Sequence, residues 1–435
     1  MTDEYAGHMR DIEATISRLR HTWGIPQEPN GIATRAGRLM MNLNVLRLMG
    51  TVSISSIPDV ARPIMKYGLL RTFRDGFVPL VTNFQAMKLS AREVKLAGAA
   101  LDPVLHTRAA ALFDVLDDLG RTSKFERGVE YLSHRQGVVA LFDYWTSAMK
   151  QFTGVVANAE LLDSVRLVVQ GGAKREVKKA TEYLARNGID GNIAADIWRE
   201  TTQAGGGNRV NGVWWPNTEA WKDPATVRAY RSALVREVDN AIITPGVERP
   251  LWTNSTMLGR IVSQFQSFAF SSTTKTLAAG LQEDTAKVLV GMNISLAFGA
   301  LSYYLWALSV GGDALKEANK FDPAKYADEA ITRSGLLGIG DIGQRILERI
   351  PATAPYATFS GQRTTRRGGD ELLGAIGGPS LDLLENASNV LMGADEPTQA
   401  TANSARRLLP WQNVFYIRQG YDQVIDAFEL PESRK

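Results

Sequence analysis

Three glycines form the most recognisable chemical motif in this chain. Gly338, Gly340 and Gly343 have the spacing G-x-G-x-x-G, which in dinucleotide-binding proteins follows a β-strand and presents backbone N–H groups to a pyrophosphate. The residues before it, 326–331, have a helical pattern instead. Because the required strand is missing, we interpret the motif as a junction between helices and expect no bound cofactor.

A second motif has the spacing of a nucleophile and its base. Ser147 and Lys150 match S-x-x-K, but the S-D-N and K-T-G elements of penicillin-recognising enzymes are absent. The chain has no cysteine and only four histidines, which excludes thiolate chemistry and argues against a histidine-rich metal centre. No isolated pair of acidic residues suggests glycosidase chemistry. We therefore expect a protein without enzymatic activity, cofactor or metal.

Basic side chains cluster at two places, although the net charge is only +3. Such clusters contact phosphates weakly, without base specificity and with steep salt dependence. The alternative is that they are merely solvated, since aromatic residues of the kind that stack on single strands are not interleaved with them. The candidate DNA-contacting residues are Lys174, Arg175, Lys178 and Lys179 on a predicted helix over 172–187, and Arg363, Arg366 and Arg367 in a Gly/Thr-rich loop.

One segment stands out by its lack of charge. Residues 288–312 carry no charged side chain between Lys287 and Asp313. A helix of this length would reach roughly 37 Å, enough to cross a hydrocarbon core of about 30 Å. The candidate membrane-interacting residues are Val288, Leu289, Ile294, Leu296, Phe298, Leu301, Leu305 and Trp306.

Small and polar residues dilute the hydrophobicity of this segment. Asn293 makes insertion of a single helix marginal, whereas Gly291, Ser295 and Gly299 have the small-x-x-x-small spacing that favours close helix packing. A buried core helix is the competing interpretation. We predict a helix that is covered in one state and membrane-associated in another.

The elements that position these residues are predicted to be helices throughout, because strand signals are sparse. We expect an extended all-α protein with irregular Gly/Pro-rich connections, in which residues 204–217 form the clearest loop and a long apolar helix lies near 254–311. Four regions follow from the breaks: a helical arm (1–36), a helical body (37–250), the long helix (251–312) and a C-terminal docking region (313–435).

The last helix is predicted to be a docking element. Its apolar residues recur at helical spacing, and Pro410 suits the first helical position. The stripe would cover the chain's own core, a neighbouring subunit or another protein. Its main members are Trp411, Phe415, Tyr421 and Phe428.

Three stretches in this order resemble the internal virion, or DNA-ejection, proteins of short-tailed bacteriophages and related large polyvalent phage proteins. Residues 45–59 contain the L-R-L-M-G and S-I-S-S-I-P-D sequences. The second stretch, residues 188–268, runs through Trp214, Trp221 and Trp252 and ends in G-R-I-V-S-Q-F-Q-S-F (259–268). Residues 406–418 read R-R-L-L-P-W-Q-N-V-F-Y-I-R. The resemblance covers about 40–430. The chain lacks the lytic transglycosylase region of the largest members, so the resemblance implies no peptidoglycan cleavage.

The resemblance implies a protein packaged inside the capsid near the portal and released to form or support a conduit for the genome. Its expected partners are further copies of itself, other ejection proteins, the portal, the phage DNA backbone and, after ejection, the host inner membrane. Its expected locations are the virion and later the host periplasm and inner membrane. The alternative is a membrane-active pore-forming or scaffold helical protein of another origin.

Overall fold

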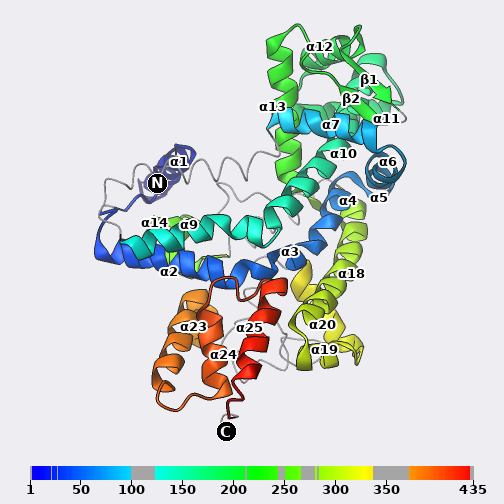
Figure 1. Ribbon diagram of the computed structural model, residues 1–435. Coiled ribbons are helices and arrows are strands. Elements are labelled where there is room, and N and C mark those ends of the chain that lie inside the picture. Colours follow the sequence, from blue (N-terminus) through cyan, green and yellow to red (C-terminus); the bar gives the residue numbers. More distant parts are fainter. Residues whose placement is uncertain are drawn as a thin grey trace.

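The computed structural model (Figure 1) confirms the all-α class. It describes residues 2–20, 22–26, 28–98, 123–210, 213–242, 250–265, 280–281, 284–336 and 372–431. Within these ranges the only strands are β1 (Gly207–Val210) and β2 (Val213–Pro216), which pair antiparallel.

The upper lobe in Figure 1 is built around the long helix α10 (Phe142–Gln170). Its core is apolar, and one buried amide ties three elements together: Asn158 Nδ2 donates to Ser90 Oγ and to the main-chain oxygen of Trp214, each at 3.0 Å, and Tyr230 donates to Asn158 Oδ1. This satisfied polar centre fixes the register of the packed elements. Around α10 lie α7 (Phe84–Ala97), α11 (Lys174–Arg186), α12 (Gly191–Thr202), α13 (Pro224–Ala241) and the hairpin.

Local signals set the ends of several helices. Asn187 and Gly188 end α11, and Gly188 has a φ of 76°. Asp190 then caps α12 by accepting from the N–H of Ile193 at 2.8 Å. The end of α11 agrees with the helix predicted over 172–187. α9 (Lys124–Val139) begins with a reciprocal capping box between Ser123 and Glu126.

The predicted loop over 204–217 is wrong in part, because it contains the hairpin. Gly205 has a φ of 82°, and a Cβ at Gly206 would collide with the main-chain oxygen of Glu200. Trp221 Nε1 donates to the main-chain oxygen of Gly206 at 2.7 Å. The strands are four residues each and are held by contacts with α7, α10 and α12. They are too short for an alternation of polar and apolar residues to predict them from the sequence.

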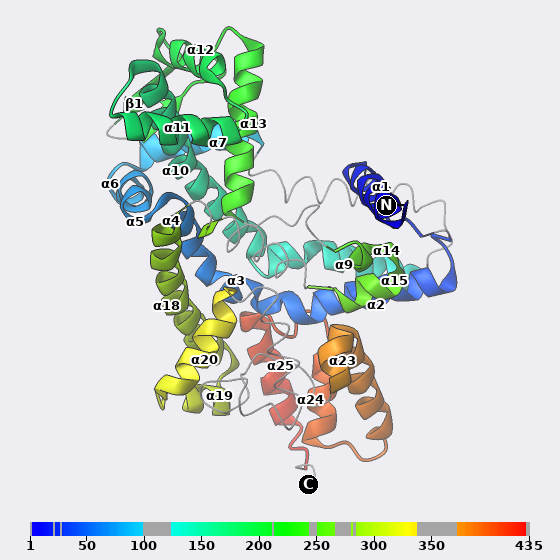
Figure 2. The same cartoon turned by 180° about the vertical axis from the view of Figure 1, so that it is seen from behind.

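A chain of short helical turns connects the lower part of the molecule with the upper lobe. These turns follow α2 (Ile32–Leu48), which lies beside α9, and run along α10. α1 (Thr2–Leu19) projects to one side in Figures 1 and 2. The turns are η1 (Met49–Thr51), α3 (Val52–Ser55), η2 (Ile57–Ala61), α4 (Arg62–Tyr67), α5 (Leu69–Arg71), η3 (Thr72–Phe77) and α6 (Val78–Thr82).

The long apolar helix is confirmed over α18 (Thr285–Val310), but residues 252–265 do not continue it. They form two short helices, α14 (Trp252–Ser255) and α15 (Met257–Val262), separated by the extended backbone of Thr256. The Thr256 hydroxyl accepts from the N–H of Gly259 at 3.0 Å and starts the second helix. The extended backbone at Thr256 therefore breaks the helix here, although the segment contains no proline that would have predicted a break.

The C-terminal part packs beneath α2 and beside α18. α19 and α20 cover the end of α18, whereas the last three helices form a group below α2. The elements are α19 (Gly312–Ala318), α20 (Pro323–Ser334), α23 (Leu372–Met392), α24 (Gln399–Leu408) and α25 (Phe415–Ala427).

Candidate functional site: an apolar edge and basic surfaces

The residues with catalytic spacing are engaged elsewhere in the structure. Ser147 Oγ accepts from Gln151 Nε2 at 2.9 Å, and the buried Nζ of Lys150 lies 3.3 Å from Asp239. Among the described residues no group of three or more His, Asp or Glu side chains is arranged to hold a metal ion. The G-x-G-x-x-G motif lies outside the described residues.

Small residues let α18 approach its neighbours closely, as their spacing predicted. A Cβ at Gly291 would collide with Met65 of α4, and a Cβ at Gly299 would collide with the main-chain oxygen of Ala330 in α20. On the same face Ser295 and Ser302 donate to main-chain oxygens of neighbouring segments at 3.3 and 2.8 Å. The face of α18 that carries the small residues therefore packs against other segments of the same chain.

The opposite face of α18 is an exposed apolar stripe. Leu289 is 51% exposed and Leu301 is 43% exposed, and Val290 and Leu308 share this face. Asn293 lies in the stripe, and its Nδ2 donates to the main-chain oxygen of Leu289 at 2.9 Å, so one of its amide N–H groups is satisfied within the helix. Among the described helices α18 is the one long and apolar enough to cross a membrane.

The structure separates the eight predicted membrane-interacting residues. Leu289 and Leu301 are exposed. The others are buried or half-buried, in part against Ala61, Met65 and Leu336. Val290 and Leu308 were not predicted from the sequence, since the periodicity of an almost wholly apolar helix does not reveal its outward face. The covered residues are Val288, Ile294, Leu296, Phe298, Leu305 and Trp306.

A second exposed apolar surface adjoins the start of α18. Leu70 is 87% exposed and Val81 is 85% exposed. α5 and α6 lie at the upper end of α18 on the same side of the molecule in both Figure 1 and Figure 2, and a Cβ at Gly68 would be 3.5 Å from the Lys287 side chain. We use the name apolar edge for the exposed apolar residues of these two adjoining segments: Leu69, Leu70, Phe73, Val78, Leu80, Val81, Phe84, Leu289, Val290, Leu301 and Leu308.

Half-buried ion pairs fix this edge to α10. Arg71 lies 2.5 Å from Glu160 and 3.0 Å from Asp163. Trp214 Nε1 donates to Asp163 at 3.0 Å. Burial alone would raise the pKa of Asp163, but the indole hydrogen bond and the charge of Arg71 outweigh it and lower the pKa. The exposed turns are thus held by a charged network beneath them.

The predicted basic stripe is present and solvated. Lys174, Arg175, Lys178 and Lys179 are all exposed on α11, and only a 3.9 Å pair with Glu182 partly offsets Lys178. They are available to an anionic partner. Arg363, Arg366 and Arg367 lie outside the described residues.

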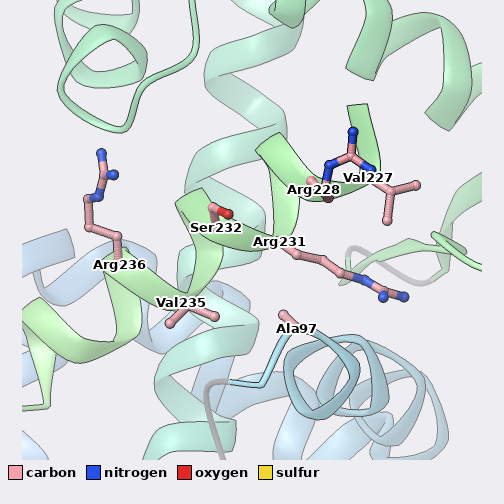
Figure 3. Close-up of a pocket in the computed structure, with 7 residues that line it drawn as sticks. All are labelled: Ala97, Val227, Arg228, Arg231, Ser232, Val235 and Arg236. Carbon is pink, nitrogen blue, oxygen red and sulfur yellow. The ribbon is translucent and has the colours of Figure 1, made fainter. Parts of the chain in front are cut away.

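A further basic surface follows α13 (Figure 3). Arg228, Arg231 and Arg236 line an open groove of 470 Å³ together with apolar and small residues. Arg231 donates to the Thr218 hydroxyl at 2.8 and 3.2 Å, and Arg236 donates to a main-chain oxygen at 3.2 Å. In Figure 3 the guanidinium groups point in different directions, which suits an extended polyanion better than a single small ion. The three arginines were not predicted as a basic cluster because they are separated from one another in the sequence.

The predicted C-terminal docking helix begins later than expected. Trp411 has a φ of 58°, so Pro410 does not open a helix and α25 starts at Phe415. The Trp411 N–H donates to the main-chain oxygen of Leu46 at 2.8 Å, which ties this turn to α2. Of the four predicted docking residues, Phe415 and Phe428 are exposed, whereas Trp411 and Tyr421 are half-buried in the chain's own packing.

No protein-family model, curated protein or solved structure matches this chain. The resemblance to phage ejection proteins therefore remains a prediction that depends on the three motifs alone.

Proposed function

We propose that this chain is a non-enzymatic phage virion protein of the ejection type whose apolar edge contacts the host membrane. The observation that carries the proposal is the exposed stripe of α18 with the neighbouring apolar turns of α5 and α6. Exposed apolar surface of this extent on a folded protein is typical of a binding face. Lipid is the partner that suits an exposed apolar edge whose longest helix carries no charged side chain between Lys287 and Asp313.

In this arrangement α18 would lie on the membrane instead of crossing it. Its other side packs against α20, where Arg333 pairs with Glu329 at 2.9 Å and lies 4.7 Å from the Trp306 ring. Both charged side chains are buried. A helix surrounded by lipid would have to separate from these charges. A spanning state would therefore be a second conformation, reached only when α18 leaves α4 and α20.

The basic surfaces of α11 and α13 support a further part of the proposal, contact with the backbone of the phage genome. Three or four arginine and lysine side chains on each surface would give weak, salt-sensitive binding without base specificity. The exposed Phe415 and Phe428 of α25 remain candidates for docking to a second copy, another ejection protein or the portal.

The alternative is a membrane-active pore-forming or scaffold protein of another origin, because the apolar edge alone does not distinguish a phage context. Electron cryomicroscopy and mass spectrometry of intact and emptied particles test the difference. The ejection proposal expects the chain inside intact particles and its loss on genome release. Absence from purified particles contradicts it and leaves the membrane-active alternative.

A further inference from the structure

Four arginines gather where residues 406–418 pack against α2. Arg47 is 1% exposed, Arg406 5% and Arg418 9%, and Arg407 is half-buried beside them. Arg47 is hydrogen-bonded to Asp382. The cluster is therefore unusually rich in buried positive charge.

Only two carboxylates among the described residues pair with these arginines. Asp422 lies 3.4 Å from Nε of Arg418 and 3.1 Å from Nη1 of Arg406, the latter outside hydrogen-bonding orientation. Asp382 is the other, so four guanidinium groups share two negative charges. A buried charge that lacks a counter-charge is strongly unfavourable.

Several buried donors of the cluster also lack a hydrogen-bond partner. They are Nε and Nη1 of both Arg47 and Arg406, Nε of Arg407 and the indole Nε1 of Trp411. Buried polar groups in folded proteins are nearly always satisfied, so a group of unsatisfied donors indicates an absent acceptor. The amide oxygen of Gln412 has no partner either.

Backbone contacts bring these side chains together. Gln412 Nε2 donates to the main-chain oxygen of Arg47 at 3.0 Å, and the Trp411 N–H donates to the main-chain oxygen of Leu46 at 2.8 Å. The pKa of Arg47 is lowered by burial, an effect that Asp382 partly offsets and that the nearby charge of Arg407 increases. Arg47 and Arg407 are thus close enough to repel each other.

We propose that this cluster binds a small tetrahedral oxyanion, phosphate, between α2 and residues 406–412. Guanidinium forks match phosphate oxygens, and the Trp411 indole would supply a further donor. The O–H of hydrogen phosphate would satisfy the Gln412 oxygen, which sulfate lacks the proton to do. An extended nucleic acid does not fit, because the unsatisfied atoms are buried. Bound phosphate would fasten the C-terminal segment to α2.

The test compares the thermal stability of the full chain in phosphate and in chloride at equal pH and ionic strength. We expect phosphate to raise the Tm in a saturable way, by about 1–2 °C at a phosphate concentration several-fold above its Kd. Sulfate should raise the Tm less. Arg407→Met should abolish this rise. In chloride the same variant should be at least as stable as the wild type, because it removes an uncompensated charge near Arg47.

Two further variants keep the result interpretable. Arg407→Lys retains the charge and should keep part of the phosphate effect, whereas Lys178→Met on the exposed stripe of α11 should keep all of it. Line broadening in the phosphorus-31 NMR spectrum of phosphate would report binding independently of unfolding, and this broadening should be abolished in Arg407→Met. No phosphate-specific rise in the wild type, or a full rise in Arg407→Met, would overturn the proposal.

Discussion

The α-carbon of Gly50 packs directly against the main chain of Asn413, so closely that a Cβ at Gly50 would collide with the peptide that joins Asn413 to Val414. These residues belong to the first and the third of the motifs that resemble ejection proteins, and they are separated by most of the chain. Gln412 Nε2 donates to the main-chain oxygen of Arg47 in the same contact, at 3.0 Å. Two motifs that are distant in sequence thus form one packed junction.

Gly50→Ala should open this junction. A methyl group forced into a closed backbone contact costs about 1–3 kcal/mol, and thermal unfolding should show this destabilisation. Gly420→Ala is the matched control, because a Cβ at Gly420 in α25 would meet nothing within 4 Å. That variant should gain up to about 1 kcal/mol from helix propensity. Equal stability of the two variants would contradict the described packing.

The apolar turns of α5 and α6 should contribute to membrane binding without contributing to folding. Leu70→Ser and Val81→Ser change the two most exposed residues of the edge, so the free energy of unfolding should change by less than about 0.5 kcal/mol. Vesicle flotation should nevertheless fall, since each substitution removes apolar surface that would touch lipid. Unchanged flotation of the double variant would restrict the membrane contact to α18.

Asp163 should make the upper lobe sensitive to acid. Its lowered pKa means that the folded state favours the carboxylate, so its contribution to stability is present above the ordinary pKa of about 3.9 and is lost as the pH falls below it. Asp163→Asn keeps an acceptor for Trp214 but loses the charge facing Arg71. We expect it to cost about 1.5–3 kcal/mol at neutral pH and to flatten the acid limb of the stability curve measured by urea unfolding. A cost that is the same at pH 2 and pH 7 would argue against this role.

DNA binding should be weak and should disappear with salt. Replacing Lys174, Arg175, Lys178 and Lys179 with Gln should reduce the slope of log affinity against log salt by about 0.9 for each phosphate that is no longer neutralised. Arg228→Gln with Arg236→Gln tests the groove on α13 in the same way. Lys316→Gln on α19 is the control, because this exposed lysine already pairs with Asp313 at 3.2 Å. Fluorescence anisotropy with a labelled duplex measures all three, and no binding at low salt would remove DNA as a partner.

The helices could be predicted from the sequence wherever one face differs clearly from the other or a cap marks an end. α11 and the Asp190 cap of α12 are examples. The outward face of α18 could not be predicted, because it depends on which segments Gly291 and Gly299 meet, and Met65 is distant in sequence. Periodicity carries no such information in a helix that is apolar all round.

The candidate sites were predictable only in part for the same reason. Closely spaced basic residues predict the stripe of α11. Arg228 and Arg236 are eight residues apart in the sequence and line the same groove because both lie on α13. The left-handed backbone of Trp411, which is bound to Leu46, delays the start of α25 to Phe415. The arginine cluster depends on residues from α2 and the C-terminal segment, which no local pattern connects.

The contact between α18 and lipid can be measured directly because the chain has no cysteine. Single substitutions Val290→Cys, Leu301→Cys and Leu308→Cys place an environment-sensitive fluorophore along the exposed stripe, and Ser232→Cys places it on α13 as the control. We predict that vesicles shift the emission of the three stripe labels to shorter wavelength and that brominated lipids quench them, while the label at 232 is unaffected. Stripe labels that keep their aqueous emission in the presence of vesicles, or a control label that is quenched equally, would contradict the membrane-contacting role of the apolar edge.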